Sequence, residues 1–281
     1  MPLLKYINQF VYLFEETLSQ FFRWRIWLVL VVYALIAWLV LYIHYNISST
    51  LFFSIMKVWT ALVASGQAAG FFHYPGHFAL MPQYFEWAKL ILSILLEGLF
   101  LGTAAMLFRN IYRGTKQDLT GTFKKQLRLW GQLILALVVF NAVFTLVGWV
   151  LPTLFAPLIR GYGRRTLMFA FVLMPLVYSI ILALFYFAIP SIALGGLNFL
   201  KGIGRSLTIF GRRSFTCFFL SVIILSVPVV VAAATQQSDY LIEKFHPEIV
   251  YWLLVLGLIV DMVAAFLWMG TAARFLASEE S

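Results

Sequence analysis

Six uninterrupted apolar runs, each about as long as a bilayer is thick, constrain the fold of this chain more than any other feature. They cover residues 26–45, 90–108, 133–151, 167–189, 215–234 and 249–270. A helix needs about 20 residues to cross about 30 Å of hydrocarbon, and each run is close to that length. The runs are continuous rather than alternating, which favours helices over barrel strands. We therefore predict an all-α polytopic membrane protein with six transmembrane helices in one domain, residues 1–281.

The scarcity of charge supports the same fold class. Hydrophobic residues make up 63% of the chain and charged residues only 11%, whereas a soluble domain carries about 25% charged residues. A soluble fold of this size could not cover its surface with so few charges. We expect the excess apolar area to face lipid, and we expect no soluble domain.

Basic, amphipathic segments precede three of the runs. We predict interfacial helices at about 3–22, 116–130 and 197–211, before the first, third and fifth spans. The second and third of these segments share a pattern eighty positions apart, with matched basic, leucine, aromatic and glycine positions (Lys125 and Arg205, Leu127 and Leu207, Trp130 and Phe210, Gly131 and Gly211). Each copy then enters an apolar run, which indicates a repeated unit of a surface helix followed by a span.

A further apolar segment, at about 50–72, is harder to assign. Lys57 and Gln67 interrupt it, and a seventh span would put the basic cluster of 109–128 on the opposite side of the membrane. We interpret it as an interfacial or re-entrant helix, and a spanning helix remains the alternative.

The basic residues are distributed unevenly between the two sides that six spans define. Segments on the side of the termini hold fourteen of them: Lys5, Arg23, Arg25, Arg109, Arg113, Lys116, Lys124, Lys125, Arg128, Lys201, Arg205, Arg212, Arg213 and Arg274. The other side holds six: Lys57, Lys89, Arg160, Arg164, Arg165 and Lys244. The positive-inside rule then predicts cytoplasmic N- and C-termini in a bacterial inner membrane. Because the cations flank apolar runs, we expect contact with anionic lipid rather than nucleic acid.

Three polar residues lie inside predicted spans. Glu97 is near the middle of the second span, Asp261 is in the middle of the sixth, and Asn141 is in the third. Ionisable residues at such depth are expensive and usually face the bundle interior. One interpretation is a proton, cation or coupling site. The other is a structural carboxyl that is hydrogen-bonded to a neighbouring helix, with Asn141 as an interhelical contact.

Glu97 is followed by a pair of glycines at the spacing of one helical turn, Gly98 and Gly102. Two small residues four positions apart let helix backbones approach closely, so we predict a helix-packing face here. The overlap with Glu97 indicates that the acid faces protein rather than lipid.

Nine basic residues could bind lipid headgroups. Arg160, Arg164 and Arg165 form an outer loop with two glycines, which could hold a phosphate, or the side chains could simply reach the headgroup layer. On the termini side the candidates are Lys124, Lys125, Arg128, Arg205, Arg212 and Arg213. This second group could alternatively dock an acidic partner protein.

Neither catalytic nor metal chemistry has a recognisable pattern in the chain. The histidines at 44, 73, 77 and 246 fall outside or at the edge of the spans, and Pro75-Gly76 separates His73 from His77. There is neither an HExxH frame nor a GxSxG nucleophile motif. The single cysteine, Cys217, rules out an intrachain disulfide. We expect no enzyme, no metal and no cofactor.

One stretch resembles a bacterial membrane family. Phe187-Ala188-Ile189-Pro190, Arg205-Ser206-Leu207 and Gly211-Arg212, which lead into the run 215–234, resemble the YciC-like, glycerophosphodiesterase-membrane-domain-like six-span proteins of the bacterial inner membrane. The resemblance implies an inner-membrane helical bundle and brings no activity onto particular residues.

A second resemblance is to the permease subunits of ATP-driven exporters, which also have an N-terminal amphipathic helix and six spans. It implies a cytoplasmic ATPase partner that contacts 112–130 or 195–212. The long segment 46–88 departs from that pattern, because a short loop would be expected there.

Together these patterns predict a non-enzymatic inner-membrane bundle. It would bind or help move lipid or other apolar molecules, or scaffold an envelope complex. The alternative is the permease subunit of a transporter, either ABC-type or proton-coupled. Membrane lipids are the expected partners, a partner protein or ATPase is expected only in the second case, and oligomer formation is left open.

Overall fold

The computed structural model describes residues 2–64, 66, 68–116, 118–159 and 163–279, and it is entirely helical in its regular structure. It is 89% helical with no strands among these residues. The elements are α1 (Pro2–Leu18), α2 (Trp24–Tyr45), α3 (Thr50–Ala64), α4 (Ala68–Phe71), α5 (Gly76–Leu92), η2 (Ser93–Glu97), α6 (Gly98–Tyr112), α7 (Leu119–Ile159), α8 (Gly163–Met168), η3 (Phe169–Leu173), α9 (Met174–Phe185), α10 (Ala188–Gly195), α11 (Phe199–Thr235), α12 (Ser238–Lys244) and α13 (Ile249–Glu279).

Six helices are long and apolar enough to cross a membrane: Trp24–Tyr45, Gly76–Tyr112, Leu119–Leu158, Gly163–Gly195, Phe199–Thr235 and Ile249–Glu279. The predicted all-α polytopic fold is thus confirmed, and the chain is a multi-pass membrane protein. Each predicted span lies inside one of these helices, most of which extend well beyond the predicted run.

The amphipathic segment before the third span is not a separate helix, whereas a kink separates the one before the fifth span from the apolar run that follows it. α7 begins at Leu119 and α11 at Phe199. Gly131 does not interrupt α7, because one glycine only weakens a helix. In α11 the change of direction falls at Arg213, whose φ of −134° and ψ of 33° are not helical. α1 is joined to its span by a longer non-helical connection, residues 19–23.

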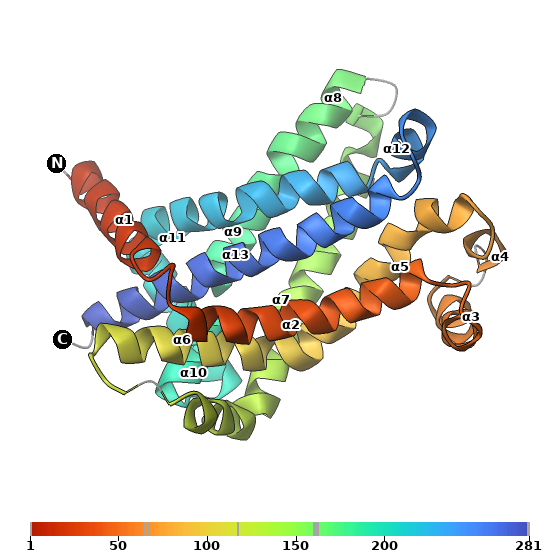
Figure 1. Ribbon diagram of the computed structural model, residues 1–281. Coiled ribbons are helices and arrows are strands. Elements are labelled where there is room, and N and C mark those ends of the chain that lie inside the picture. Colours follow the sequence, from red (N-terminus) through yellow and green to blue (C-terminus); the bar gives the residue numbers. More distant parts are fainter. Residues whose placement is uncertain (1, 65, 67, 117, 160–162, 280–281) are drawn as a thin grey trace.

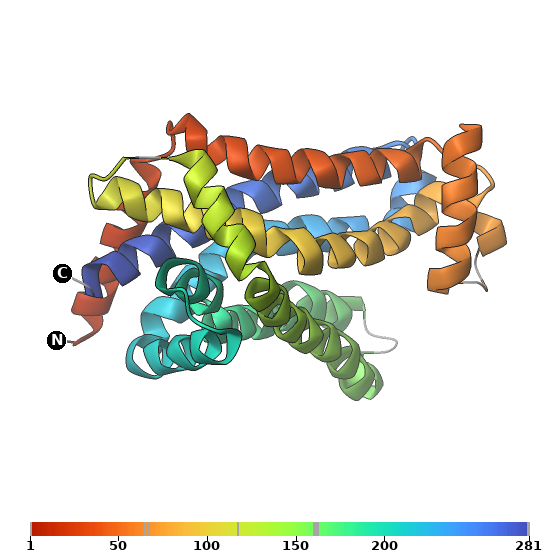
Figure 2. The same ribbon diagram turned by 90° about the horizontal axis from the view of Figure 1, so that it is seen from below.

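α2, α6, α13 and the later part of α11 lie roughly along one direction, α7 crosses them obliquely, and both termini are at the same end of the bundle (Figures 1 and 2). α3 runs across that direction at the opposite end. Its 15 residues extend about 22 Å at 1.5 Å per residue, less than the hydrocarbon thickness. The predicted segment 50–72 therefore comprises α3 and α4.

The buried core differs between the two ends. At the end with the termini, a large cluster joins α1, α2, α6, α7, α9, α10, α11 and α13. At the opposite end a smaller cluster joins only α2, α3, α4, α5 and α13. We call these the closed end and the divided end. At the divided end, α7 and α8 lie apart from α2 and α5 (Figure 2).

Candidate functional site

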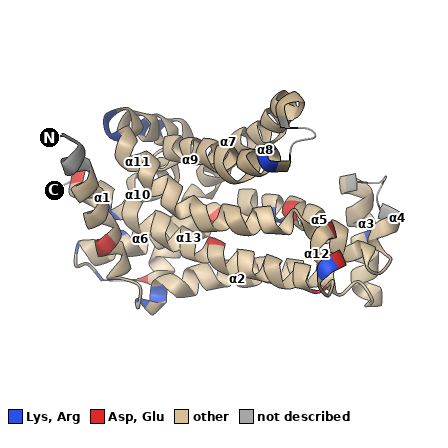
Figure 3. Cartoon of the chain, turned by 90° about the horizontal axis from the view of Figure 1, so that it is seen from above, with Lys and Arg blue, Asp and Glu red and all other residues tan. Residues whose placement is uncertain are grey.

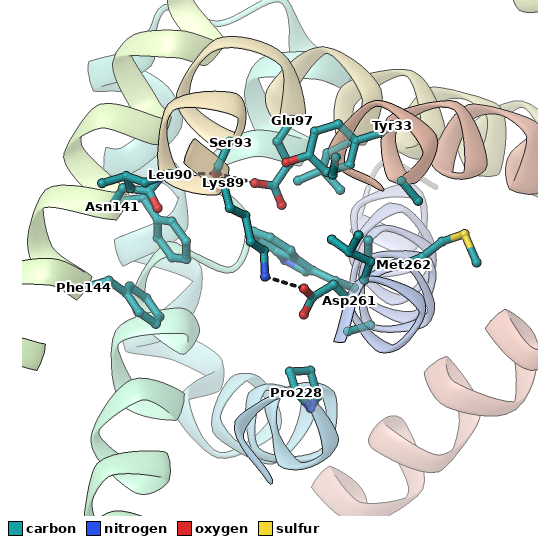
Figure 4. Close-up of a pocket in the computed structure, with 18 of the residues that line it drawn as sticks. Tyr33, Lys89, Leu90, Ser93, Glu97, Asn141, Phe144, Pro228, Asp261 and Met262 are labelled. Atoms are coloured by element: carbon teal, nitrogen blue, oxygen red, sulfur yellow. Dashed lines mark hydrogen bonds and ion pairs between the residues drawn. The ribbon is translucent and has the colours of Figure 1, made fainter. Parts of the chain in front are cut away.

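A cavity of about 510 Å³ lies between two groups of helices. One wall comes from α2, α5, η2, α6 and α13, and the other from α7, α9 and α11. Every one of these elements belongs to a helix able to span a membrane. The cavity therefore lies within the membrane-spanning part of the fold (Figure 4).

An ion pair crosses from α5 to α13 in this cavity. Lys89 Nζ lies 2.6 Å from Asp261 Oδ2, and the two side chains are 33% and 37% exposed. The pair is thus open to whatever fills the cavity rather than sealed in protein. Figure 4 shows the Lys89 ammonium and the carboxylates of Glu97 and Asp261 pointing into the same space.

Glu97 belongs to a second polar group that reaches α7. The Ser93 hydroxyl donates a short hydrogen bond to Glu97 Oε2. Asn141 Nδ2 donates to Ser93 Oγ at 3.3 Å and to the Leu137 carbonyl at 3.0 Å. Asn141 thereby connects the two walls of the cavity.

Ser93 and Glu97 are the first and last residues of the π-helical turn η2, which interrupts one otherwise continuous helix from Gly76 to Tyr112. Such single π-turns accommodate an extra residue and occur frequently at functional sites. Here the turn aims Glu97 into the cavity while the next residue, Gly98, packs against α7.

The remaining walls are largely aromatic and aliphatic. Phe144 and Tyr178 stack with their ring centroids 5.1 Å apart and a 7° interplanar angle. Tyr33 packs against Phe100 at 5.6 Å on the opposite wall. Further apolar residues complete the lining, among them Leu30, Phe140, Leu182, Leu225, Pro228 and Met262. The site thus combines a mostly apolar surface with a few convergent polar groups.

The base of the cavity is held by a broken helix. Pro190 has no N–H to offer the Tyr186 carbonyl, which lies four residues earlier. The Trp268 indole N–H donates to that carbonyl at 2.9 Å instead. Nearby, Ser206 Oγ accepts from the Phe187 N–H at 3.0 Å and donates to the Leu184 carbonyl at 2.7 Å. These side chains supply hydrogen bonds to backbone groups at the break between α9 and α10.

The predicted glycine pair lies buried on α6. A Cβ on Gly98 would come within 3.0 Å of Leu133 Cβ and 2.9 Å of Leu137 Cδ1. A Cβ on Gly102 would come within 3.2 Å of Ala193 Cβ on α10. Both glycines therefore lie at close helix contacts.

The structure brings together Glu97, Asp261 and Asn141, which all line the cavity. It does not bring the predicted headgroup-binding residues there. Lys124, Lys125 and Arg128 lie in the first part of α7, and Arg205, Arg212 and Arg213 in the first half of α11. Arg164 and Arg165 are exposed in α8, at the divided end (Figure 3). Arg160 lies outside the described residues.

Polar cavity residues that sequence reasoning missed include Tyr33, Glu86, Lys89, Ser93, Thr145 and Tyr178. Lys89 had been assigned to a flank outside the second span, but its helix continues past it and the side chain pairs inside the cavity. Ser93 precedes Glu97 by four residues, a spacing that could have indicated the contact. Tyr33 and Tyr178 carry no comparable signal.

The described residues include no group of three or more His, Cys, Asp or Glu side chains placed to hold a metal ion. No protein-family model, no curated protein and no solved structure matches this chain.

Proposed function

We propose that this membrane protein is a non-enzymatic binder of a small apolar or amphiphilic molecule, lipid-derived or lipid-like, which occupies the cavity between α7 and α13. The observation that supports it best is the cavity itself. Its volume of about 510 Å³ falls within the range of about 300–1,000 Å³ that is usual for small-molecule sites. Its apolar walls with a few placed polar groups are also typical of such sites.

The polar groups of the cavity favour binding over catalysis. Lys89 is paired with Asp261, and Ser93 bridges Asn141 and Glu97. Neither histidine nor cysteine is among the described residues that line the cavity. The arrangement resembles a set of fixed contacts for a headgroup more than a nucleophile with its general base.

The binding role can be tested by filling the cavity. Ala34 on α2 lines it, and Ala142 on α7 is exposed and does not. Native mass spectrometry of the purified full-length protein should detect a copurifying small molecule in the wild type, and the single variants Ala34→Phe and Ala142→Phe are measured beside it. We expect loss of that molecule in Ala34→Phe and retention in Ala142→Phe. Equal retention in both variants would contradict the proposal.

Transport is the second candidate function, and the divided end favours it. Between Val138 and Leu158, α7 has no fully buried side chain, and beyond the partly buried Phe140 and Phe144 its residues join neither core cluster. Movement of this part against α2 and α5 could open the cavity. A coupled transporter reconstituted in liposomes should lose flux in Glu97→Gln and in Asp261→Asn. Full flux in both variants would remove these carboxyls from any coupling role.

An ABC-type form of the transporter would require a cytoplasmic ATPase. Its contact would fall on 112–130 or 195–212, which lie at the closed end near the termini. A pull-down from native membranes that recovers an ATPase with the wild type, and loses it when Lys124 and Lys125 are both changed to Glu, would support this form.

We further propose a bacterial inner membrane with both termini in the cytoplasm. The closed end carries most of the basic residues, and the positive-inside rule assigns such a side to the cytoplasm. Cys217 is the single cysteine and is buried, so Cys217→Ser provides a cysteine-free background. In intact cells, an impermeant maleimide should label Gln237→Cys but not Ser278→Cys. The reverse labelling pattern would overturn this orientation.

A further inference from the structure

The cavity has a charge balance opposite to that of the whole chain. We propose that it selects an apolar, monovalent organic cation, and that Glu97 is the group that pairs with the cation. This inference rests on the proposed function, because it takes the cavity to be a binding site, and it adds the chemical class of the ligand.

Carboxylates outnumber cations among the residues that line the cavity. Glu86, Glu97 and Asp261 contribute three acids, and Lys89 contributes the single base. In the whole chain the ratio is reversed, with 20 Lys and Arg against 11 Asp and Glu. The cavity is therefore a negatively charged site inside a positively charged protein, and field lines from such a site favour entry of a cation.

The ion pair leaves two acids without a salt bridge to any described residue, Glu97 and the exposed Glu86. Lys89 lies 2.6 Å from Asp261 and neutralises it. The hydrogen bond that Glu97 accepts comes from the neutral Ser93 hydroxyl, on Oε2. Its other oxygen, Oε1, receives no hydrogen bond from any described residue. A carboxylate in the hydrocarbon layer is strongly disfavoured without a counter-charge, so a cationic ligand would be stabilised by Glu97.

The walls indicate an organic cation rather than a metal ion. A hard metal cation takes six or more oxygen ligands, and the described residues offer no cluster of three candidate ligands. Aromatic rings surround the polar centre instead, with Tyr33, Phe100, Phe140 and Phe144 in the lining. Ring faces attract cations, most strongly when both are removed from water.

The sign of the ligand can be tested with two ions of nearly equal size and shape. Tetraphenylphosphonium is a cation and tetraphenylborate is its anionic counterpart. Binding of each to the full-length protein is measured in nanodiscs of zwitterionic lipid, with empty nanodiscs subtracted for partition. We expect saturable binding of tetraphenylphosphonium alone. Equal or tighter binding of tetraphenylborate would overturn the inference.

The role of Glu97 is tested by substitutions that separate charge from shape. Glu97→Gln keeps the acceptor for Ser93 and removes the charge, so we expect the Kd for tetraphenylphosphonium to rise about tenfold or more. Glu97→Asp keeps the charge and should retain most of the affinity. Glu243→Gln on α12, which lies outside the cavity, is the matched control and should leave the Kd unchanged. An unchanged Kd in Glu97→Gln would contradict the assignment.

A double variant distinguishes Glu97 from Asp261. Lys89→Met with Asp261→Asn removes the neutral ion pair and keeps Glu97. We expect the Kd to remain within about threefold of wild type, a change of under about 1 kcal/mol. Loss of binding in this variant, with retention in Glu97→Gln, would assign the cation to Asp261 and would overturn the proposal.

Failure of the inference differs from failure of the proposed function. A neutral molecule that copurifies with the wild type and is lost in Ala34→Phe, without binding of tetraphenylphosphonium, would refute cation selection and keep the binding role. If neither a copurifying molecule nor the cation is found, both proposals fail. Melting temperature and elution volume of each variant, measured alongside, identify any that is misfolded.

Discussion

Two apolar helical segments of this protein, Gly98–Phe108 of α6 and residues 138–158 of α7, differ completely in burial. All eleven residues of the first are buried, and no side chain of the second is. The first belongs to the core of the closed end, which almost every long helix joins. The second leads into the divided end, whose core contains no residue of α7.

The sequence explains the difference in part. Small residues on α6 let α7, α10 and α13 approach it closely. They are Gly98, Gly102, Thr103, Ala104 and Ala105. The outer part of α7 presents large side chains outward, with Trp149 72% exposed and Leu154 67% exposed. These are ordinary lipid-facing residues. The comparison teaches that close packing at one end holds the helices together, while looser packing toward the other leaves room for a cavity.

The largest expected change in stability is that of a substitution at Gly270 of α13, which is compared with Gly257 on the same helix. A Cβ on Gly270, at the closed end, would meet Thr17 and Phe108, both fully buried, with Phe108 Cζ 2.9 Å away. Overpacking of this kind costs about 1–3 kcal/mol, so Gly270→Ala should lower the melting temperature in detergent.

Gly257→Ala is the matched control for the divided end. Its Cβ would find Val231 Cγ1 at 3.6 Å, an ordinary contact. We expect an unchanged or slightly higher melting temperature, because alanine is favoured over glycine in a helix by about 0.5–1 kcal/mol. Equal destabilisation by both substitutions would show that the two ends are packed alike.

A smaller effect is expected at the break near Pro190. Trp268→Phe removes the donor to the Tyr186 carbonyl and leaves a buried acceptor unsatisfied, which costs about 1–3 kcal/mol. Adding Pro190→Ala returns a backbone N–H to that carbonyl. The melting temperature lost in Trp268→Phe should therefore be partly regained in the double variant. Strictly additive effects would show that the indole acts through packing alone.

The smallest effect concerns the basic residues of the two ends. Lys125→Gln with Arg128→Gln, on the exposed surface of α7, should reduce the anionic lipid retained by the purified protein, since each cation contributes about 1 kcal/mol near a charged surface. Arg164→Gln with Arg165→Gln is the comparison at the divided end and should have less effect. Lipid analysis at low and high salt measures both. A larger loss from the second pair would reverse the assignment of the anionic leaflet.

Much of the fold was predictable, because each span is a continuous apolar run of sufficient length. The lengths of the helices were not. The basic residues at 116–130 are typical of a surface helix, but α7 continues from Leu119 into the apolar run without a break. The kink at Arg213 lies two residues after Gly211, but a single glycine in such a pattern does not by itself predict a kink.

The candidate site was predictable only where one residue is unusual by itself. Glu97 and Asp261 stand out as acids in apolar runs, and Asn141 as an amide in another. Lys89 does not stand out, because a lysine near the end of a span usually reaches the headgroups. Its partner, Asp261, lies 172 residues away in the chain, and a single sequence contains no signal for such a pairing.

The extra residue stored in the turn Ser93–Glu97 sets the phase of the helix on either side. Lys89, before the turn, reaches α13, while Gly98 and Gly102, after it, contact α7 and α10. Deleting one residue from 93–97 would restore a regular α-helix and rotate the two halves by about 100° against each other. Lys89 could then no longer reach Asp261 while Gly98 and Gly102 still pack against α7 and α10. The number of residues between Lys89 and Gly98 is therefore fixed by both contacts.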